Sequence, residues 1–337
     1  MSIQSSELVW RKSAVVSDTA SNGGKMGTTI SVSGAKNNIF ADVPQAERTA
    51  GSTKYRKMFI LVNNGEADGN GNLGLSLIAP KLFVETRTPG QDAVTIFLGD
   101  QTDTEATVTG SEPVYGMGEL TNTVSGGASS IVVTVEDWTN LPIFRNGDTI
   151  RISNKTSIND GAGTEEYHVI NGAPADSGNQ ITLTLTSPLA NGYTAGSATK
   201  ISSVIEPGDV ACSVDGFSNN GSGTFAASGI TTDAVGTIEE DWTLIFDTAT
   251  TYTVRDSLAA SVGSGNVGSD FSPNNPNGGT YFTLLSASFG GTFEAAETID
   301  FSTHPAAIPV WYRRDVPAGA ASLSGNSVIV AIDGESS

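Results

Sequence analysis

The residue types that most often carry catalysis are scarce in this sequence. His168 and His304 are the only histidines. A Ser-His-Asp site would need one of them beside a nucleophile, and no Gly-x-Ser-x-Gly motif accompanies either. His168 lies inside a strand-like run, and His304 precedes Pro305, which favours an extended or turn geometry. We therefore expect packing or turn roles for both histidines and no catalytic residue.

Metal and cofactor chemistry is also weakly supported. One cysteine and two histidines far apart in sequence are a poor basis for a zinc site. Asp68-Gly-Asn-Gly-Asn72 places oxygen ligands at alternate positions, as an EF-hand loop begins, but Leu73 stands where Gly is needed and Ala79 where Glu is needed. We expect a hairpin loop there, with a bound cation as the alternative. No phosphate-binding Gly-rich motif occurs, so we expect no cofactor and no metal.

Carboxylate pairs and the single thiol complete the candidates for chemistry. Glu165-Glu166 and the run 239–241 could hydrolyse glycosides only if two carboxylates stood on facing walls. Adjacent acids on one strand point to opposite faces instead, and aromatic residues make up only 7% of the chain, which leaves little for a sugar-stacking cleft. Cys212 lies in an apolar run, so we expect a buried, inert thiol. The sequence predicts that the protein is not an enzyme.

Charge and hydropathy restrict the partners. Asp and Glu number 36 against 17 Lys and Arg, for a net charge of -19. Phosphate binding needs a clustered positive surface, so we expect neither nucleic acid nor an anionic membrane as a partner. The acidity favours solubility, with a basic partner or bound cations as the alternative. The sequence shows neither a signal-peptide pattern at its start nor a stretch approaching about 18 apolar residues.

The elements that would position these residues are strands. Lys54–Val62 changes from alternating to continuously apolar, as in a strand that runs into a covered core. An Asn-Gly turn at 146–147 directly precedes an alternating run that ends at Ile152, a strong hairpin signal. The only helical signal is short, at 43–50, where Pro44 could open one or two turns. A long polar loop is expected over 263–279.

These patterns predict an all-β protein of antiparallel β-sandwich domains with a small β-barrel-like middle domain. The predicted ranges are 1–118 for an N-terminal sandwich, 119–205 for the middle domain and 206–337 for a C-terminal sandwich. Similar tripeptides, Ser111-Glu-Pro113 and Ile205-Glu-Pro207, border the middle range, which suggests that it is inserted.

Two basic clusters stand out against the acidic background. Side chains of the tandem Arg313-Arg314 should face opposite sides of a strand, so one could pair internally while the other reaches a neighbouring chain. Arg and aromatic residues are favoured in interface cores. The candidate interface residues are Tyr55, Arg56, Lys57, Trp311, Arg313 and Arg314. The alternative is an ordinary solvated edge.

Several segments together resemble a known class of protein. They are Ser6–Ser13, Asn22–Lys25, Asn37–Phe40, Lys54–Lys57, Phe144–Ser153, Pro188–Tyr193, Ile238–Phe246, Phe271–Pro276 and His304–Gly319. In order and pattern they are similar to structural proteins from the virions of contractile-tailed bacteriophages, over nearly the whole chain. No single motif among them is diagnostic.

The resemblance implies a non-enzymatic component of the virion neck or collar, tail or baseplate, assembled in the host bacterial cytoplasm. Its partners would be copies of itself, in a symmetric multimer with strand-rich interfaces, and other virion structural proteins. The alternative is a tail fibre or tailspike that binds or depolymerises a host-surface glycan. A bacterial adhesin is a further alternative, but it would need a secretion signal.

Overall fold

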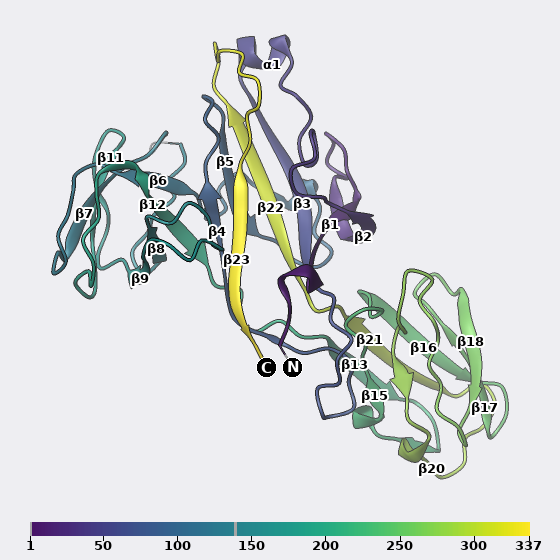
Figure 1. The fold of residues 1–337 in the computed structure, drawn as a ribbon. Helices are drawn as coiled ribbons and strands as arrows, with labels where there is room; N and C mark the ends of the chain where they lie inside the picture. Colours follow the sequence, from purple (N-terminus) through teal and green to yellow (C-terminus); the bar gives the residue numbers. More distant parts are fainter. Residues whose placement is uncertain (1, 138–139) are drawn as a thin grey trace.

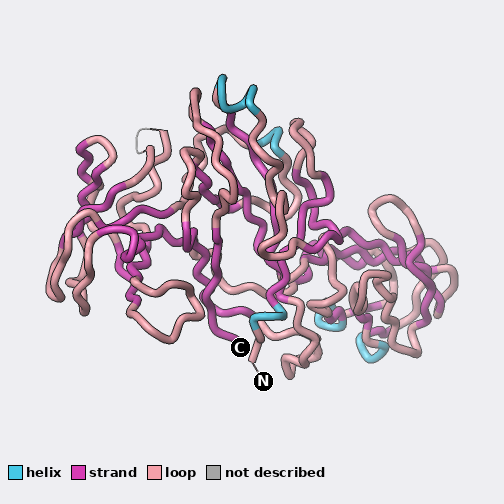
Figure 2. The backbone as a smooth tube through the Cα atoms, turned by 45° about the horizontal axis from the view of Figure 1, so that its top comes forward, coloured by secondary structure: helices cyan, strands magenta, loops and turns pink. Residues whose placement is uncertain are grey.

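The chain folds into antiparallel β-structure in a computed structural model that describes residues 2–137 and 140–337 (Figure 1). Helical segments are few and short, as the tube in Figure 2 shows. They are α1 (Gln45–Ala50), η1 (Ser5–Glu7), η2 (Glu105–Thr107), η3 (Ala227–Gly229) and η4 (Ser286–Ser288). None of the described helices is long and apolar enough to cross a membrane. The predicted all-β class is confirmed, and α1 lies inside the predicted helical range.

The centre of the molecule begins with a five-stranded sheet in the order β2-β1-β3-β22-β5. Its strands are β1 (Leu8–Val15), β2 (Gly23–Ile30), β3 (Ser52–Val62), β5 (Ala93–Leu98) and β22 (Ala307–Val316). β22 pairs with β3 from Ala307 to Val316, and β5 pairs along its other side. The second half of β3, from Lys57 to Val62, is buried at every position, as its continuous apolar run predicts.

A second layer covers this sheet. It contains β4 (Leu77–Thr86) and β23 (Ile329–Ser336), which pair with each other. Buried Ile60 and Val310 from the first sheet share one hydrophobic cluster with Leu82 and Val84 from β4. Burying each such aliphatic side chain contributes about 1.5–3 kcal/mol to folding. We call these two layers the central sandwich.

The strands of the middle lobe, residues 117–205, pair in the order β10-β11-β7-β6-β12-β8-β9, and they share one nine-stranded sheet with β4 and β23, because β12 also pairs with β4 at Val204 and Ile205. The strands of the lobe are β6 (Met117–Leu120), β7 (Ser130–Thr134), β8 (Thr149–Ser153), β9 (Glu165–Val169), β10 (Ala175–Ser177), β11 (Gln180–Thr184) and β12 (Gly196–Ile205). The ends of β9 and β11 approach each other through a single bridge between Ile170 and Leu185. No ladder joins β9 to β11, so the lobe resembles a barrel without being a closed one.

The lateral lobe, residues 213–304, has a sheet in the order β13-β21-β16-β17-β18 and two short strand pairs. The sheet strands are β13 (Ser213–Asn219), β16 (Glu240–Phe246), β17 (Thr251–Arg255), β18 (Ser261–Asn266) and β21 (Thr298–His304). The short pairs are β14 (Thr224–Phe225) with β20 (Phe289–Gly290), and β15 (Ile230–Thr231) with β19 (Thr283–Leu284). Its core is aromatic, with Trp242, Tyr252 and Phe282 almost fully buried. The predicted loop over 263–279 is therefore a strand in its first part.

Both lobes are insertions into the central sandwich. The middle lobe leaves and returns on paired strands, with Met117 of β6 opposite Ser202 of β12. The lateral lobe does the same, with Ser213 of β13 opposite His304 of β21. The predicted C-terminal domain, 206–337, therefore covers parts of two units: the lateral lobe, and the strands β22 and β23 of the central sandwich. Figure 1 shows the chain passing through the centre again after each lobe.

Each lobe is fixed to the centre by specific contacts. In the middle lobe, the buried Arg151 guanidinium lies 4.6 Å from the ring centroid of Phe83 on β4. In the lateral lobe, the loop between β3 and β4 forms a short bridge, in which Leu73 N–H donates to Thr232 O at 2.9 Å. An ion pair between Lys25 Nζ of β2 and Glu240 Oε2 of β16, 3.2 Å apart, adds a charged contact.

Candidate functional site

The structure places His168 between a carboxylate and a hydroxyl. On β9, its Nε2 lies 2.9 Å from Glu166 Oε2 and its Nδ1 lies 3.1 Å from Ser187 Oγ. The residue types and distances match those of a Ser-His-acid hydrolase site. The spacing of Glu166 and His168 on one face of a strand could have been read from the sequence. The contact of Ser187 with His168 could not be read from the sequence, because it depends on the path of the turn that follows β11.

The surroundings give this group a structural role. Glu166 also accepts hydrogen bonds from Ala190 N–H at 2.8 Å and Asn191 N–H at 3.1 Å, so its carboxylate organises the turn after β11. Burial raises the pKa of Glu166, but these amides and His168 outweigh it and keep the pKa below its usual value. Pro188 follows Ser187 and has no N–H to stabilise an oxyanion. These residues line neither the cleft that contains Leu98 and His304 nor the small cavity that contains Arg87 and Glu136.

His304 lies between two carboxylates at the base of the lateral lobe. Its Nδ1 is 2.8 Å from Glu239 Oε2, and its Nε2 is 3.1 Å from Asp215 Oδ1. Because the two acids occupy opposite ring nitrogens, the three side chains do not converge on a point where an ion could sit. No group of three or more His, Cys, Asp or Glu side chains in the described ranges could hold a metal ion.

A cleft of about 270 Å³ lies beside His304, where the lateral lobe meets the central sandwich. Leu98, Pro207, Val210, Pro305 and His304 are among its lining residues. Cys212 lies between two of the lining residues, and burial raises the pKa of its thiol to about 11. A thiol with that pKa is almost entirely protonated near neutral pH, which makes it a poor nucleophile.

The Asp68–Asn72 segment is a turn that joins the lateral lobe. The carboxylate of Asp68 accepts the N–H of Asn70 at 2.7 Å and the side-chain amide of Asn72 at 2.9 Å. The other side of the Asn72 amide, its Oδ1, accepts Thr232 N–H at 3.0 Å. These oxygens therefore have partners within the protein, which favours the hairpin-loop expectation over a cation.

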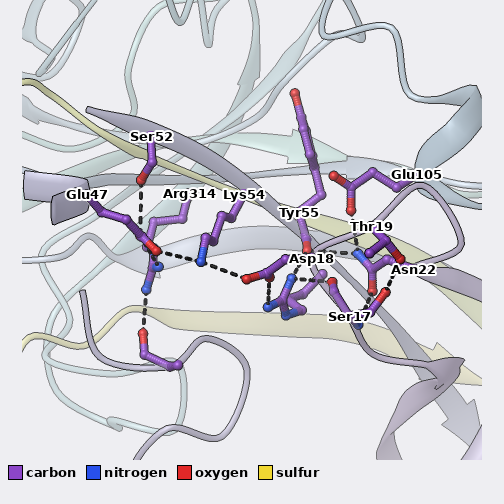
Figure 3. Close-up of polar contacts among 12 residues, drawn as sticks. Ser17, Asp18, Thr19, Asn22, Glu47, Ser52, Lys54, Tyr55, Glu105 and Arg314 are labelled. Carbon is purple, nitrogen blue, oxygen red and sulfur yellow. Dashed lines mark hydrogen bonds and ion pairs between the residues drawn. The ribbon is translucent and has the colours of Figure 1, made fainter. Parts of the chain in front are cut away.

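Arg314, a predicted interface residue, is 5% exposed and its guanidinium has partners within the chain (Figure 3). Its Nη1 donates to Ala41 O at 2.8 Å and its Nη2 lies 3.6 Å from Glu47 Oε2. The guanidinium also lies 4.7 Å from the ring centroid of Phe40. These contacts attach the segment between β2 and α1 to the central sheet.

Arg56 belongs to the same polar group. Its Nη1 donates to Ser17 O at 2.9 Å, its Nη2 pairs with Asp18, and its guanidinium lies 5.7 Å from the Phe40 ring. Lys54 pairs with Asp18 at 2.8 Å and with Glu47 at 2.6 Å, as Figure 3 shows. Hydrogen bonds to these two carboxylates raise the pKa of Lys54.

Lys57 and Trp311 form a buried group around one carboxylate. Lys57 Nζ lies 2.5 Å from Asp103 Oδ1 and 2.9 Å from Gly24 O, and Trp311 Nε1 donates to Asp103 Oδ2 at 2.7 Å. Trp311 is 0% exposed and Lys57 is 1% exposed. Burial lowers the pKa of Lys57, with Asp103 opposing that effect.

Arg313 faces the other side of β22 from Arg314, as strand geometry predicts. Its Nε donates to Asp315 Oδ2 at 2.8 Å, and its Nη2 donates to Asp315 Oδ1 at 3.1 Å. Tyr55, opposite Arg313 in the ladder, packs edge-on against Phe97. The expectation of surface anchors therefore needs correction for Lys57, Trp311 and Arg314, because folding places them in contact with carboxylates and rings of the same chain.

Exposed apolar side chains lie elsewhere. Val15, Val16, Ile30 and Val32 are 41–63% exposed, and they account for four of the ten exposed large hydrophobic residues in the described chain. Val15 and Ile30 end β1 and β2, and Val16 and Val32 lie one and two residues beyond them; because the strands are antiparallel, the two pairs lie at opposite ends of β2. β2 is the edge strand of its sheet, and among the described residues its outer side forms no ladder, only an isolated bridge from Gly23 to Thr104. Sequence analysis missed this surface because Ser, Thr and Gly surround these residues.

Comparison of the chain with protein-family models, with curated proteins and with solved structures finds no match.

Proposed function

We propose that the protein is a non-enzymatic structural component of a tailed-phage virion that assembles into a symmetric multimer. The sequence resemblance suggests the setting, and the surface along β1 and β2 supports assembly. That surface combines the outer edge of β2, along which no ladder forms in the described structure, with exposed aliphatic side chains near both ends of the strand, Val15 and Val16 at one end and Ile30 and Val32 at the other. An unprotected edge is a template for pairing with another chain, and apolar exposure beside it favours burial on association.

The architecture suits a mechanical role. The central sandwich holds two lobes, each inserted on a pair of adjacent strands and each fixed by further contacts. Forces on either lobe would therefore pass into several paired strands instead of one linker. Repetition of a modest interface by symmetry gives large cumulative stability.

Surface chemistry argues against the glycan-binding alternative. Sugar recognition commonly uses aromatic rings as stacking platforms, but the aromatic side chains of the lateral lobe form its core. None of the large hydrophobic residues exposed in the described ranges is aromatic. Glycan binding is therefore the less favoured proposal.

The test of assembly uses the purified full-length protein. Ile30→Asp should shift a concentration-dependent multimer toward monomer in light scattering, because it places a charge on the proposed interface. Leu323→Asp is the matched control, since Leu323 is similarly exposed at 51% but lies in the connection between β22 and β23. A chain that stays monomeric at high concentration, or responds equally to both changes, would contradict the proposed interface.

The virion setting needs its own test. Antibody against the chain should label particles in electron microscopy, at one substructure. Protein found in infected-cell lysate but never on purified particles would exclude a virion role, whatever its oligomeric state.

A further inference from the structure

His304 occupies the point where the lateral lobe returns to the central sandwich. It is the last residue of β21, and Ser213, the first residue of β13, lies opposite it in the ladder. The two connections between lobe and centre, 206–212 and 305–306, therefore meet beside this ring. Both connections also contribute residues to the 270 Å³ cleft that His304 lines.

The ring links two neighbours of β21. Asp215 belongs to β13 on one side, and Glu239 directly precedes β16 on the other. Their carboxylate oxygens lie 3.1 Å from Nε2 and 2.8 Å from Nδ1. A neutral imidazole carries one N–H and can donate to only one of them, whereas the imidazolium donates to both. Nδ1 is hydrogen-bonded to Glu239, whereas Nε2 lies within ion-pair distance of Asp215 without hydrogen-bond geometry, so the attraction to Asp215 needs the positive charge of the protonated ring.

The charges around His304 are predominantly negative. Asp209, from the connection before β13, lines the same cleft and accepts Ala79 N–H at 2.9 Å. Glu240, which directly follows Glu239 in the sequence, already pairs with Lys25 of the central sheet. In the described structure, the ion pairs of His304 are with Asp215 and Glu239, and no Lys or Arg pairs with either of these acids. Lys57 also acts electrostatically on Glu239, but its ammonium pairs directly with Asp103. Loss of the ring's proton would therefore leave Asp215 and Glu239 without an ion-pair partner.

We propose that His304 is a proton-dependent clasp that holds the base of the lateral lobe closed. The protonated ring ties β13 to the segment before β16 and keeps both connections packed against the centre. Deprotonation releases one carboxylate, and repulsion among Asp209, Asp215 and Glu239 loosens the connections and opens the cleft. This inference does not depend on the proposed virion role.

The direction of the pH effect follows from the pKa of the ring. Burial lowers that pKa, but the contacts with the carboxylates of Glu239 and then Asp215 outweigh burial and raise it above its usual value of about 6.5. A raised folded-state pKa means that the clasp contributes fully at pH below about 6.5 and is lost as pH rises through the folded value. The lobe should be most firmly closed at mildly acidic pH.

The primary test measures opening of the connections in the full-length protein. Cleavage by a nonspecific protease within 206–212, located by mass spectrometry, should be faster at pH 8.5 than at pH 6. The open population should change about tenfold for each unit that separates the ring's pKa in the closed and open forms. His304→Gln should cleave at the high-pH rate throughout, after correction for protease activity. His168→Gln, which changes the other histidine, should keep the wild-type dependence.

NMR provides a second measurement that does not require a destabilising change. The ring protons of His304 should titrate above about 6.5, and Asp215→Asn should move that titration to lower pH. The proposal is overturned if His304 titrates at or below 6.5, or if His304→Gln retains the wild-type pH dependence of cleavage. If the glutamine variant does not fold, the titration in wild type and Asp215→Asn decides alone.

Discussion

Arg314 on β22 and Arg56 on β3 both approach the ring of Phe40, at 4.7 Å and 5.7 Å from its centroid. Tyr312, two residues before Arg314, is the direct partner of Arg56 in the ladder. Two guanidinium groups from adjacent strands thus hold one aromatic residue of a long connection. This arrangement explains why arginines that suggested an intermolecular contact serve an intramolecular one.

Phe40→Ala should release the connection between β2 and α1. Each cation–π contact contributes about 0.5–1 kcal/mol at a partly exposed site, so the expected loss in unfolding free energy is about 1–2 kcal/mol. Limited proteolysis should show new cleavage within 31–44. Phe40→Tyr keeps the ring and is the control. Unchanged protection of the connection in Phe40→Ala would show that other contacts hold it.

Lys57→Met should destabilise the central sandwich by about 3 kcal/mol, because it leaves Asp103 without its buried cation. Urea denaturation of the full-length protein measures the change. Lys36→Met is the control, since the side chain of Lys36 is 80% exposed and its pairing with Asp42 should contribute less than about 1 kcal/mol.

The double variant Lys57→Met with Asp103→Asn separates charge burial from packing. It should lose less stability than Lys57→Met alone, because no unpaired carboxylate remains. Equal losses in the two variants would indicate that the pairing with Asp103 matters less than the other contacts of Lys57, whose Nζ lies 4.9 Å from the Phe59 ring centroid and 5.9 Å from that of Trp311.

Ser187 should be unreactive despite its contact with His168. We expect no labelling by a fluorophosphonate probe, with an authentic serine hydrolase as the positive control. Glu166→Gln should instead lower stability by about 1–2 kcal/mol, because it weakens hydrogen bonds that organise the turn. Labelling that disappears in Ser187→Ala would contradict the structural assignment and reveal a hydrolase site.

The lateral lobe should be separable from the rest of the chain. Ser213 and His304 are ladder partners, so their Cα atoms are about 4.5–5.5 Å apart and a short Gly-Ser turn can replace the residues between them. The shortened protein should keep a cooperative thermal transition and β-type circular dichroism. Residues 213–304 expressed alone should also fold, since their aromatic core is self-contained. Failure of both pieces would show that the lobe and centre fold as one unit.

Local sequence pattern determined much of the secondary structure. The apolar run in Lys54–Val62 lies within β3, the Asn-Gly turn precedes β8, and the short helical signal contains α1. These features depend on side-chain alternation and turn chemistry within a few residues, which a sequence displays directly. The all-β class follows from the same information.

Only the tertiary structure decided which strands pair and which charges meet. β22 lies between β3 and β5 although more than 200 residues separate Val310 from Leu98, its ladder partner. That pairing buries Trp311, brings Lys57 to Asp103, and makes the lateral lobe an insertion instead of part of a terminal domain. Pairing over such separations depends on the summed burial of whole sheets, which no local pattern encodes. For the same reason, the sequence shows that His304 precedes a proline, but only the fold shows that the carboxylates of Asp215 and Glu239 lie beside its ring.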